Sequence, residues 1–166
     1  MNKYRTHRCD ELRKSDVDKN VSLSGWINKK RDHGNLLFID LRDNYGITQC
    51  IIDKENKNFS ELEKIQLETV IKVNGKVVNR SVETRNKDIV TGEIEVVISE
   101  YETLGICKEL PMPVFSDQEY AEEIRLKYRF LDLRRKRIHE NIILRSKAIS
   151  YIRNEMTELG FLEFQT

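Results

Sequence analysis

Short runs in which apolar and polar residues alternate fill roughly the first hundred positions of this 166-residue chain. Alternation with a period of two is typical of β-strands that bury one face, and turn-forming residues separate the runs. The predicted strands cover Val21–Ile27, Leu36–Leu41, Gly46–Asp53, Thr69–Val78 and Glu93–Ile98. This part of the chain is therefore predicted to be mainly β.

One helix is predicted between the third and fourth strands. The apolar residues that recur there at roughly helical spacing are Phe59, Leu62 and Ile65. Either Asn58 or Ser60 is suited to cap its start. Five strands with a helix between the third and fourth are the order of elements in an OB-fold barrel. Gly75, inside the fourth strand, suits a bulge or a close backbone approach where such a barrel curves. Any small antiparallel sheet with a helix is the alternative.

The chain changes character after residue 107. Its only two prolines, at positions 111 and 113, mark a linker. Beyond them Glu119–Arg137 is dense in helix formers, and a further helix is predicted from about His139 to Leu159, with Gly160 as its stop. The last residues read as the beginning of an apolar strand, so we expect a fragment of a longer protein. The predicted organisation is a barrel at 1–107, a linker or hinge at 108–137 and the start of another domain at 138–166.

Composition limits the partners and the setting. Charged residues make up 34% of the chain, but the net charge is only +1, so a nucleic-acid surface has to be a local patch. No run approaches the about 20 apolar residues of a membrane span. The first 20 residues are polar throughout, so neither a signal peptide nor a membrane partner is expected. The scattered cysteines and histidines fit no zinc site or disulfide framework, which predicts no bound metal and a reduced, cytoplasmic setting.

The stretch Gly25–Gln49 carries the chemistry of the predicted barrel: a basic run, a tight turn, an alternating strand and a second turn. If Leu37 and Ile39 face the core, Phe38 between them is presented outward. An outward phenylalanine among basic residues is a stacking platform for a nucleic-acid base, worth about 1–3 kcal/mol per base. The alternative is a structural module in which Phe38 belongs to the core.

Polar residues near this platform are further candidates. The basic run at 29–31 suits phosphate contacts, and Arg31 can reach base edges. The amide of Gln49 offers a donor and an acceptor side by side, which matches the edge of a uridine. Arg80 and Glu95, on the fourth and fifth strands, add a cation and a carboxylate that can contact other bases. For each residue the alternative is ordinary polar surface, or charge that protects a strand edge.

The sequence contains no arrangement for catalysis. It lacks a phosphate-cradling loop, a nucleophile elbow and paired histidines at helical spacing. These residues are therefore expected to bind rather than to catalyse. A stand-alone OB-fold protein that binds single-stranded nucleic acid remains an alternative.

Three motifs resemble the bacterial type of aspartyl-tRNA synthetase. Gly25–Gln49 resembles the anticodon-binding OB domain of that family, and Glu122–Arg135 (EEIRLKYRFLDLRR) resembles its hinge. Gly160–Thr166 (GFLEFQT) resembles class II motif 1, whose proline would come next, and Thr91–Val96 also matches. The resemblance covers essentially the whole chain in order. It favours this family over the lysyl- and asparaginyl-tRNA synthetases, which share the OB-fold.

The resemblance implies a role for each candidate residue. Phe38 falls where the family stacks an aromatic ring on the middle anticodon base, uridine, and Gln49 falls where the edge of that uridine is read. Arg31, Arg80 and Glu95 fall at positions that contact the flanking anticodon bases.

The resemblance also implies the activity of a full-length enzyme. Such an enzyme activates L-aspartate with ATP and Mg²⁺, transfers it to tRNA-Asp, and forms a homodimer through motif 1. The ATP and aspartate motifs are expected beyond Thr166, so this chain alone is expected to be inactive and to bind no cofactor.

His33 departs from part of the family. Discriminating bacterial enzymes often carry leucine at this position, whereas many enzymes that charge both tRNA-Asp and tRNA-Asn carry histidine. The two anticodons differ only at their third base, cytidine in one and uridine in the other. We hypothesise that the enzyme is non-discriminating; the alternative is that His33 is an ordinary turn residue.

Overall fold

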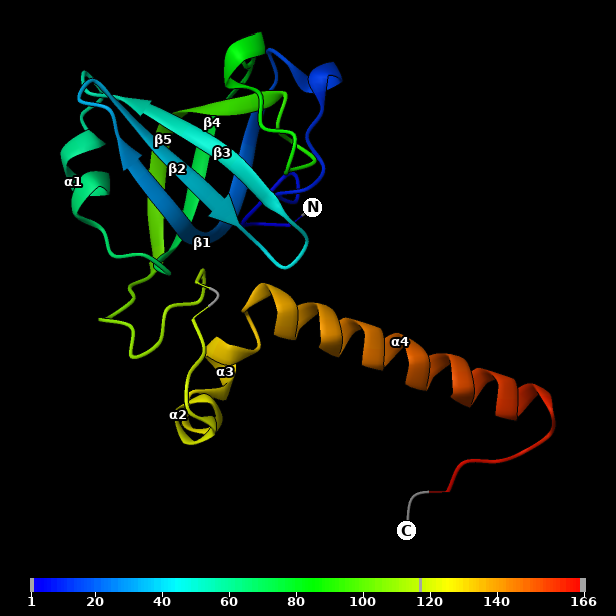
Figure 1. The fold of residues 1–166 in the computed structure, drawn as a ribbon. Coiled ribbons are helices and arrows are strands. Elements are labelled where there is room, and N and C mark those ends of the chain that lie inside the picture. Colours follow the sequence, from blue (N-terminus) through cyan, green and yellow to red (C-terminus); the bar gives the residue numbers. More distant parts are fainter. Residues whose placement is uncertain (1, 117, 165–166) are drawn as a thin grey trace. The chain divides into compact units, whose positions relative to one another are not determined.

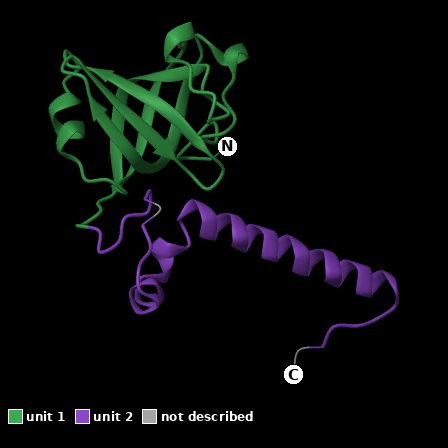
Figure 2. Ribbon diagram, in the orientation of Figure 1, with its two compact units in different colours: residues 1–109 green, residues 110–166 purple. Residues whose placement is uncertain are grey.

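The computed structural model describes residues 2–116 and 118–164. The chain divides into two compact units, residues 1–109 and 110–166 (Figure 2). Unit 1 holds the five predicted strands, which close into a barrel in the order β1-β2-β3-β5-β4 (Figure 1). Its elements are β1 (Asn20–Asp32), β2 (Leu36–Arg42), β3 (Ile47–Asp53), α1 (Phe59–Lys64), β4 (Val70–Asn79) and β5 (Ile94–Gly105), with short 3-10 helices at Lys14–Asp16 and Val82–Thr84. The predicted mainly β OB-fold, with one helix between the third and fourth strands, is confirmed.

The alternating pattern buries one face of each strand in a single core. On β2 the side chains of Leu37, Ile39 and Leu41 are buried, while the intervening Phe38 and Asp40 are only partly buried. Helix α1 covers part of the barrel by burying its own apolar residues, Phe59 and Leu62, in the same core. The inward face of β2 thus packs into the barrel core, and its outward face carries the partly exposed Phe38 and Asp40.

Two strands run further than their sequences predict. β1 continues through the basic run to Asp32, because Lys29–Asp32 pairs with Leu37–Asp40 of β2. A register shift between Ile27 and Lys29 precedes that pairing, where the strand passes from one neighbour to the next. β5 extends to Gly105 because its second half pairs with the first half of β4.

Gly75 and the start of α1 test two local predictions. The β4–β5 register shifts between Asn74 and Gly75, but the extra residue is on β5, because Asn74 pairs with Glu100 and Gly75 with Ile98. A Cβ at Gly75 would collide with the backbone oxygen of Val97, so at Gly75 the predicted close backbone approach is confirmed, opposite a bulge in β5. Asn58 stands at the N-cap of α1, but its side chain makes no capping hydrogen bond. The prediction of a capping side chain there is wrong for Asn58, whose own backbone N–H is instead bound by the Asn56 side chain at 3.0 Å.

In unit 2 the predicted helical segment Glu119–Arg137 is broken into short helices. α2 (Glu122–Lys127) and α3 (Arg129–Asp132) meet at Tyr128, whose φ of −111° and ψ of 44° interrupt the helix. The carboxyl of Asp132 is fully buried and receives hydrogen bonds from Arg125 at 3.1 and 3.2 Å and from Arg129 at 2.6 Å. This ion cluster links the two short helices through side chains on either side of Tyr128.

A single long helix, α4 (Lys136–Glu158), follows, and it starts three residues earlier than predicted. Gly160 ends it as predicted, with a φ of 88°. The N–H groups of Gly160 and Phe161 donate to the carbonyls of Thr157 and Met156, each at 3.0 Å, which is the Schellman arrangement. Within the described part of the chain, no helix combines the length and the apolar character needed to cross a membrane.

Candidate nucleic-acid interface

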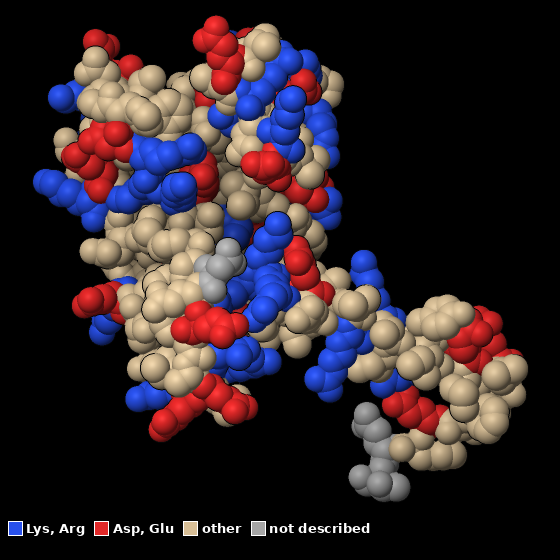
Figure 3. Space-filling view, viewed as in Figure 1, with Lys and Arg blue, Asp and Glu red and all other residues tan. Residues whose placement is uncertain are grey.

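The six predicted site residues converge on the outside of the barrel. We refer to them, together with Asp40, as the barrel-face cluster. Arg31 lies on β1, His33 in the β1–β2 turn, Phe38 and Asp40 on β2, Gln49 on β3, Arg80 directly after β4 and Glu95 on β5. Five separate stretches of sequence therefore contribute to one surface. Figure 3 shows Lys and Arg interleaved with Asp and Glu over the visible face of the molecule, so the surface is not uniformly basic.

Phe38 is the aromatic member of the barrel-face cluster. It lies outside the buried core that Leu37 and Ile39 enter, so the alternative that Phe38 is a core residue is wrong. The His33 ring meets it edge-on, with centroids 5.1 Å apart and an interplanar angle of 81°. The guanidinium of Arg31 lies 5.9 Å from the centre of the Phe38 ring. The ring thus has a cation and an aromatic edge around it, as a stacking platform requires.

A hydrogen-bonded chain crosses the barrel beside this ring. Nη2 of Arg31 donates to Oε1 of Gln49 at 3.0 Å and to Oδ1 of Asp40, also at 3.0 Å. Nε2 of Gln49 then donates to Oε2 of Glu95 at 2.8 Å. The contacts join four strands, and they fix the guanidinium, the amide and both carboxylates in one network.

Gln49 is more enclosed than its sequence pattern suggests. Only 3% of the residue is exposed, because its neighbours on β1, β2 and β5 surround the amide. An amide oxygen has two lone pairs and an amide nitrogen two hydrogens, and the network uses one of each. Gln49 therefore retains one acceptor and one donor position, which is the pair that a uridine edge complements.

Arg80 is buried with incompletely bonded donors. The residue is 8% exposed, and among the described residues its Nε and Nη1 have no hydrogen-bond partner. Burial lowers the pKa of Arg80, and the charge of Glu95 opposes this effect. Buried N–H groups without an acceptor are costly. An acceptor oxygen supplied from outside the described residues would relieve that cost.

Lys30 serves the fold rather than the ligand. Its ammonium donates to the carbonyls of Leu62 and Glu63, at 3.2 and 2.6 Å, and to that of Ile65. These carbonyls belong to the C-terminal end of α1, where a cation is favourable. Burial lowers the pKa of Lys30, and the carboxylate of Glu63 opposes this effect. The prediction that the whole basic run faces phosphates is therefore wrong at Lys30.

Sequence reasoning missed Asp40. The signal was present, because Asp40 is two residues from Phe38 on β2 and therefore shares its face. Its direct neighbour across the sheet is Gln49 of β3. Its partner is Arg31 of β1, whose Nη2 donates to Oδ1 of Asp40 at 3.0 Å, and the sequence does not reveal this cross-strand contact.

Comparisons with known proteins identify the family. Residues 21–104 match the family described as OB-fold nucleic acid binding domain. The chain belongs to this family. Residues 121–166 match a second family, described as tRNA synthetases class II (D, K and N). The OB-fold domain is thus followed by synthetase sequence, which argues against the alternative of a stand-alone binding protein.

Relatives of the OB-fold chain carry synthetase names. It is 78% identical over all 166 residues to the Aspartate--tRNA(Asp/Asn) ligase of Pelagibacter ubique (strain HTCC1062). It is 55% identical over the same length to the enzyme of that name from Phenylobacterium zucineum (strain HLK1). The resemblance to aspartyl-tRNA synthetases is thereby confirmed. The chain spans 28% of the length of each of these relatives.

Solved structures show the same fold. Asparaginyl-tRNA synthetase from Pyrococcus horikoshii, complexed with asparaginyl-adenylate, matches 96% of this chain over 36% of its own, with a TM-score of 0.81 at 24% identity. Aspartyl tRNA synthetase from Entamoeba histolytica matches 95% of this chain over 38% of its own, with a TM-score of 0.80 at 23% identity. At such low identity these matches establish a shared fold.

Proposed function

We propose that the OB-fold domain of this chain binds the anticodon loop of tRNA on behalf of an aspartyl-tRNA synthetase. The observation that carries the proposal is the barrel-face cluster, in which Phe38 lies beside the partly bonded amide of Gln49. An anticodon loop supplies unpaired bases that can be turned outward, stacked on an aromatic ring and read along their edges. Relatives with 78% and 55% identity that are named as aspartate–tRNA ligases support this target over other single-stranded RNA.

The middle anticodon base is assigned to Phe38 and Gln49. Stacking on the phenylalanine ring contributes about 1–3 kcal/mol whichever base is present. Selection then depends on the amide of Gln49, whose remaining acceptor and donor complement N3–H and a carbonyl oxygen of uridine. The ring supplies affinity, and the amide supplies the choice of base.

The flanking anticodon bases are assigned to Arg31, Arg80 and Glu95. The unmatched donors of Arg80 suit acceptor atoms on a base or phosphate. Glu95 is bonded to Gln49 through Oε2, which leaves its second oxygen for the amino group of a neighbouring base. Arg31, with its side chain 41% exposed, can reach the ligand without breaking either of its present bonds.

Recognition of both tRNA-Asp and tRNA-Asn is assigned to the β1–β2 turn. The two anticodons differ at the third base, and His33 stands next to the stacking platform, with its ring edge against Phe38. A side chain there borders the base that follows the stacked uridine. The relatives at 78% and 55% identity are named as ligases for both tRNA-Asp and tRNA-Asn, which supports this part of the proposal.

The remaining chemistry is proposed for the full-length enzyme. It activates L-aspartate with ATP and Mg²⁺, transfers the aspartate to the tRNA 3′ end in the cytoplasm, and dimerises through the motif 1 region. Among the described residues of this chain, no group of three or more His, Cys, Asp or Glu side chains could hold a metal ion.

Aminoacylation by the full-length enzyme tests the proposal. Purified enzyme is supplied with radiolabelled aspartate, ATP, Mg²⁺ and transcripts of either tRNA, and we expect aspartate on both. No aspartylation of tRNA-Asn would overturn dual specificity, and no aspartylation of either tRNA would overturn the function. A second enzyme carrying His33→Leu is expected to lose tRNA-Asn charging preferentially. Equal losses of aspartylation on both tRNAs would show that His33 is an ordinary turn residue with no part in tRNA choice.

A further inference from the structure

The amide of Gln49 is hydrogen-bonded to two partners, one that only donates and one that only accepts. Its oxygen faces Nη2 of Arg31 at 3.0 Å, and its nitrogen faces Oε2 of Glu95 at 2.8 Å. A guanidinium can only donate and an ionised carboxylate can only accept. Rotating the amide by half a turn would place its NH₂ against the guanidinium and its oxygen against the carboxylate. Both hydrogen bonds would be lost, so the network allows one orientation of the amide.

The orientation of the amide decides which pyrimidine fits. Uridine presents a carbonyl acceptor beside its N3–H donor, whereas cytidine presents an amino donor beside its N3 acceptor. The two edges are mirror patterns of donor and acceptor, and a freely rotating amide would complement either one. A fixed amide complements only one of them.

Asp40 is the anchor of this arrangement. The two hydrogens of Arg31 Nη2 are divided between Oδ1 of Asp40 and Oε1 of Gln49, both at 3.0 Å. Asp40 lies on β2 directly opposite Gln49 on β3, and its side chain is only 19% exposed. Without this carboxylate the exposed guanidinium of Arg31 keeps a single polar contact on the barrel, the one to the amide it must hold.

We propose that Asp40 is a positioning residue that makes the site prefer uridine over cytidine, by holding Arg31 against the amide oxygen of Gln49. Asp40 touches no base in this scheme. The inference rests on the proposed function, because it presumes that Gln49 reads the middle anticodon base. It adds a residue and a mechanism, namely that the specificity of the site comes from the partners that orient the amide.

Binding of the 166-residue chain to two RNA stem-loops tests the inference. Both carry the tRNA-Asp anticodon loop, and they differ only in having uridine or cytidine as the middle base. For the wild-type chain we expect the uridine loop to bind about tenfold more tightly, in line with the discrimination of a well-placed bidentate contact. Asp40→Ala is expected to reduce this ratio to about twofold or less, and Asp40→Asn, which keeps a neutral acceptor, to an intermediate value.

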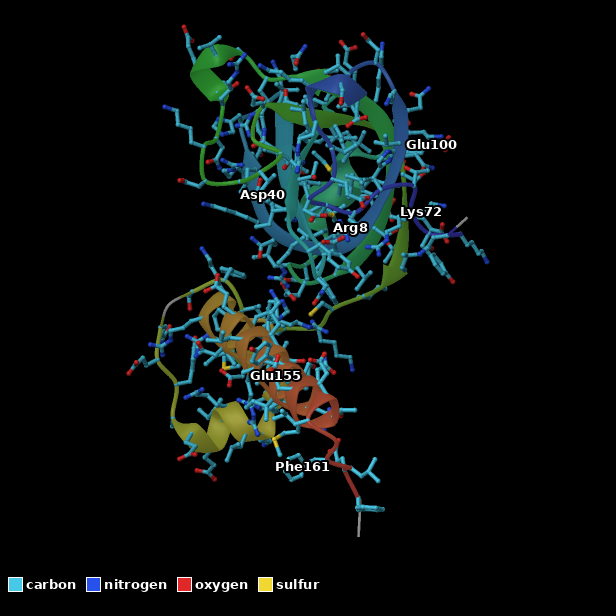
Figure 4. The ribbon with its side chains drawn as sticks, turned by 90° about the vertical axis from the view of Figure 1, so that its right-hand side faces the viewer. Arg8, Asp40, Lys72, Glu100, Glu155 and Phe161 are labelled. Carbon is cyan, nitrogen blue, oxygen red and sulfur yellow. The ribbon has the colours of Figure 1, made fainter. Side chains whose placement is uncertain are left out.

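The ratio separates positioning from a general effect of charge. Removing a carboxylate strengthens binding of any polyanion, but it does so equally for both loops. Glu100→Ala provides the matched control. Glu100 is an exposed carboxylate of β5, and Figure 4 shows it on the opposite side of the barrel from Asp40. This control is expected to keep the wild-type ratio. An unchanged ratio in Asp40→Ala, with affinity for both loops shifted together, would overturn the inference.

Two further readouts keep the outcome decisive. If circular dichroism shows that Asp40→Ala fails to fold, Asp40→Asn is used for the test. A uridine-to-cytidine affinity ratio of Asp40→Asn equal to that of the wild type would then contradict the inference. In NMR spectra the side-chain NH₂ of Gln49 is expected to shift in Asp40→Asn and to keep its position in Glu100→Ala. Failure of the proposed function looks different, because the wild-type chain itself would then bind both loops equally or not at all.

Discussion

Gln49 of β3 donates a 2.8 Å hydrogen bond to Glu95 of β5 across the one strand pair of the described barrel that runs parallel. This backbone ladder is short, joining Cys50 to Val96 and Ile51 to Val97. The side-chain bond therefore reinforces the barrel where its closure is weakest, and it also fixes the amide that we propose reads the middle anticodon base. The same contact serves the fold and the binding surface.

Arg80 is expected to cost stability in the free protein and to contribute affinity in the complex. In Arg80→Met the incompletely bonded guanidinium is replaced by an apolar side chain of similar length. We expect the free energy of unfolding to stay the same or to rise by about 1 kcal/mol, because buried N–H groups without acceptors are removed. Affinity for the anticodon stem-loop should fall about tenfold or more.

Urea unfolding and fluorescence anisotropy measure the two quantities on the same preparation. Arg85→Met, in the loop after Arg80, is the control, because its side chain is 34% exposed and pairs with Glu93 only at 3.7 Å. A loss of stability in Arg80→Met as large as its loss of binding would show that Arg80 is a structural residue.

Lys30 is expected to stabilise the barrel by binding the end of α1. Lys30→Met would leave the carbonyls of Leu62, Glu63 and Ile65 without their charged donor, so the free energy of unfolding should fall by about 1–3 kcal/mol. Lys29→Met removes the same charge from an exposed neighbour and should change stability by less than about 0.5 kcal/mol. Urea denaturation of both variants gives the comparison, and equal effects would contradict the capping role.

The Asp132 cluster predicts a pH dependence in unit 2. Burial of the carboxyl raises its pKa, but the hydrogen bond from Arg125 and the charges of Arg129 and Arg135 outweigh it and hold the pKa below its usual range. A carboxyl whose pKa is lowered by folding stabilises the protein above the unfolded pKa of about 4, and this stabilisation is lost as the pH falls through the folded value.

Asp132→Asn is therefore expected to be less stable than the wild type by about 1–3 kcal/mol near neutral pH, since the buried side chain loses its charge-assisted hydrogen bonds to Arg125 and Arg129, whose own side chains are 32% and 44% exposed. Thermal unfolding from about pH 7 down to about pH 2 should show this difference shrinking in acid. Glu123→Gln, at an exposed carboxylate of α2, should follow the wild type throughout. A gap between Asp132→Asn and the wild type that is constant with pH would show that the charge of Asp132 is not the cause.

Helix α4 is expected to mediate association of the chain. None of its described residues is buried, and its partly exposed apolar side chains include Ile142 (38%), Ile149 (43%) and Met156 (42%), which share one face of the helix. Apolar surface of this kind favours contact with a partner. Sedimentation should show a concentration-dependent dimer, which Ile149→Asp abolishes while Asn154→Asp, on another face, does not. A monomer over a wide concentration range would contradict this.

Local patterns predicted the elements well because each depends on short-range physics. The alternation of apolar and polar residues located the core face of β2. Gly160 marked the end of α4 because glycine readily adopts the left-handed conformation found there, with a φ of 88°. The extent of β1 was missed because the strand is prolonged by pairing with β2, a partner that the basic run does not reveal. The break at Tyr128 was missed because the segment contains no proline or glycine to mark it, and only the backbone dihedrals of Tyr128 reveal it.

The barrel-face cluster was predictable as a set of residues but not as a network. Strand alternation placed Phe38 outward from its own sequence neighbours alone. The bonds from Arg31 to Gln49 and from Gln49 to Glu95 span 18 and 46 positions of the chain, so only the closed barrel brings these groups together. The missing knowledge was the strand register, which also determines that Asp40 faces Gln49.

The central claim is that the outward face of the barrel binds the anticodon loop. Removal of the Phe38 ring tests this claim most directly. The measurement is the dissociation constant of the 166-residue chain for the tRNA-Asp anticodon stem-loop, compared between the wild type, Phe38→Ala and the control Tyr4→Ala, another partly exposed aromatic. We predict that Phe38→Ala weakens binding by about 1–3 kcal/mol and keeps the thermal unfolding of the barrel, while Tyr4→Ala binds as the wild type. Unchanged RNA affinity in Phe38→Ala, or a loss of affinity explained by unfolding, would contradict the account.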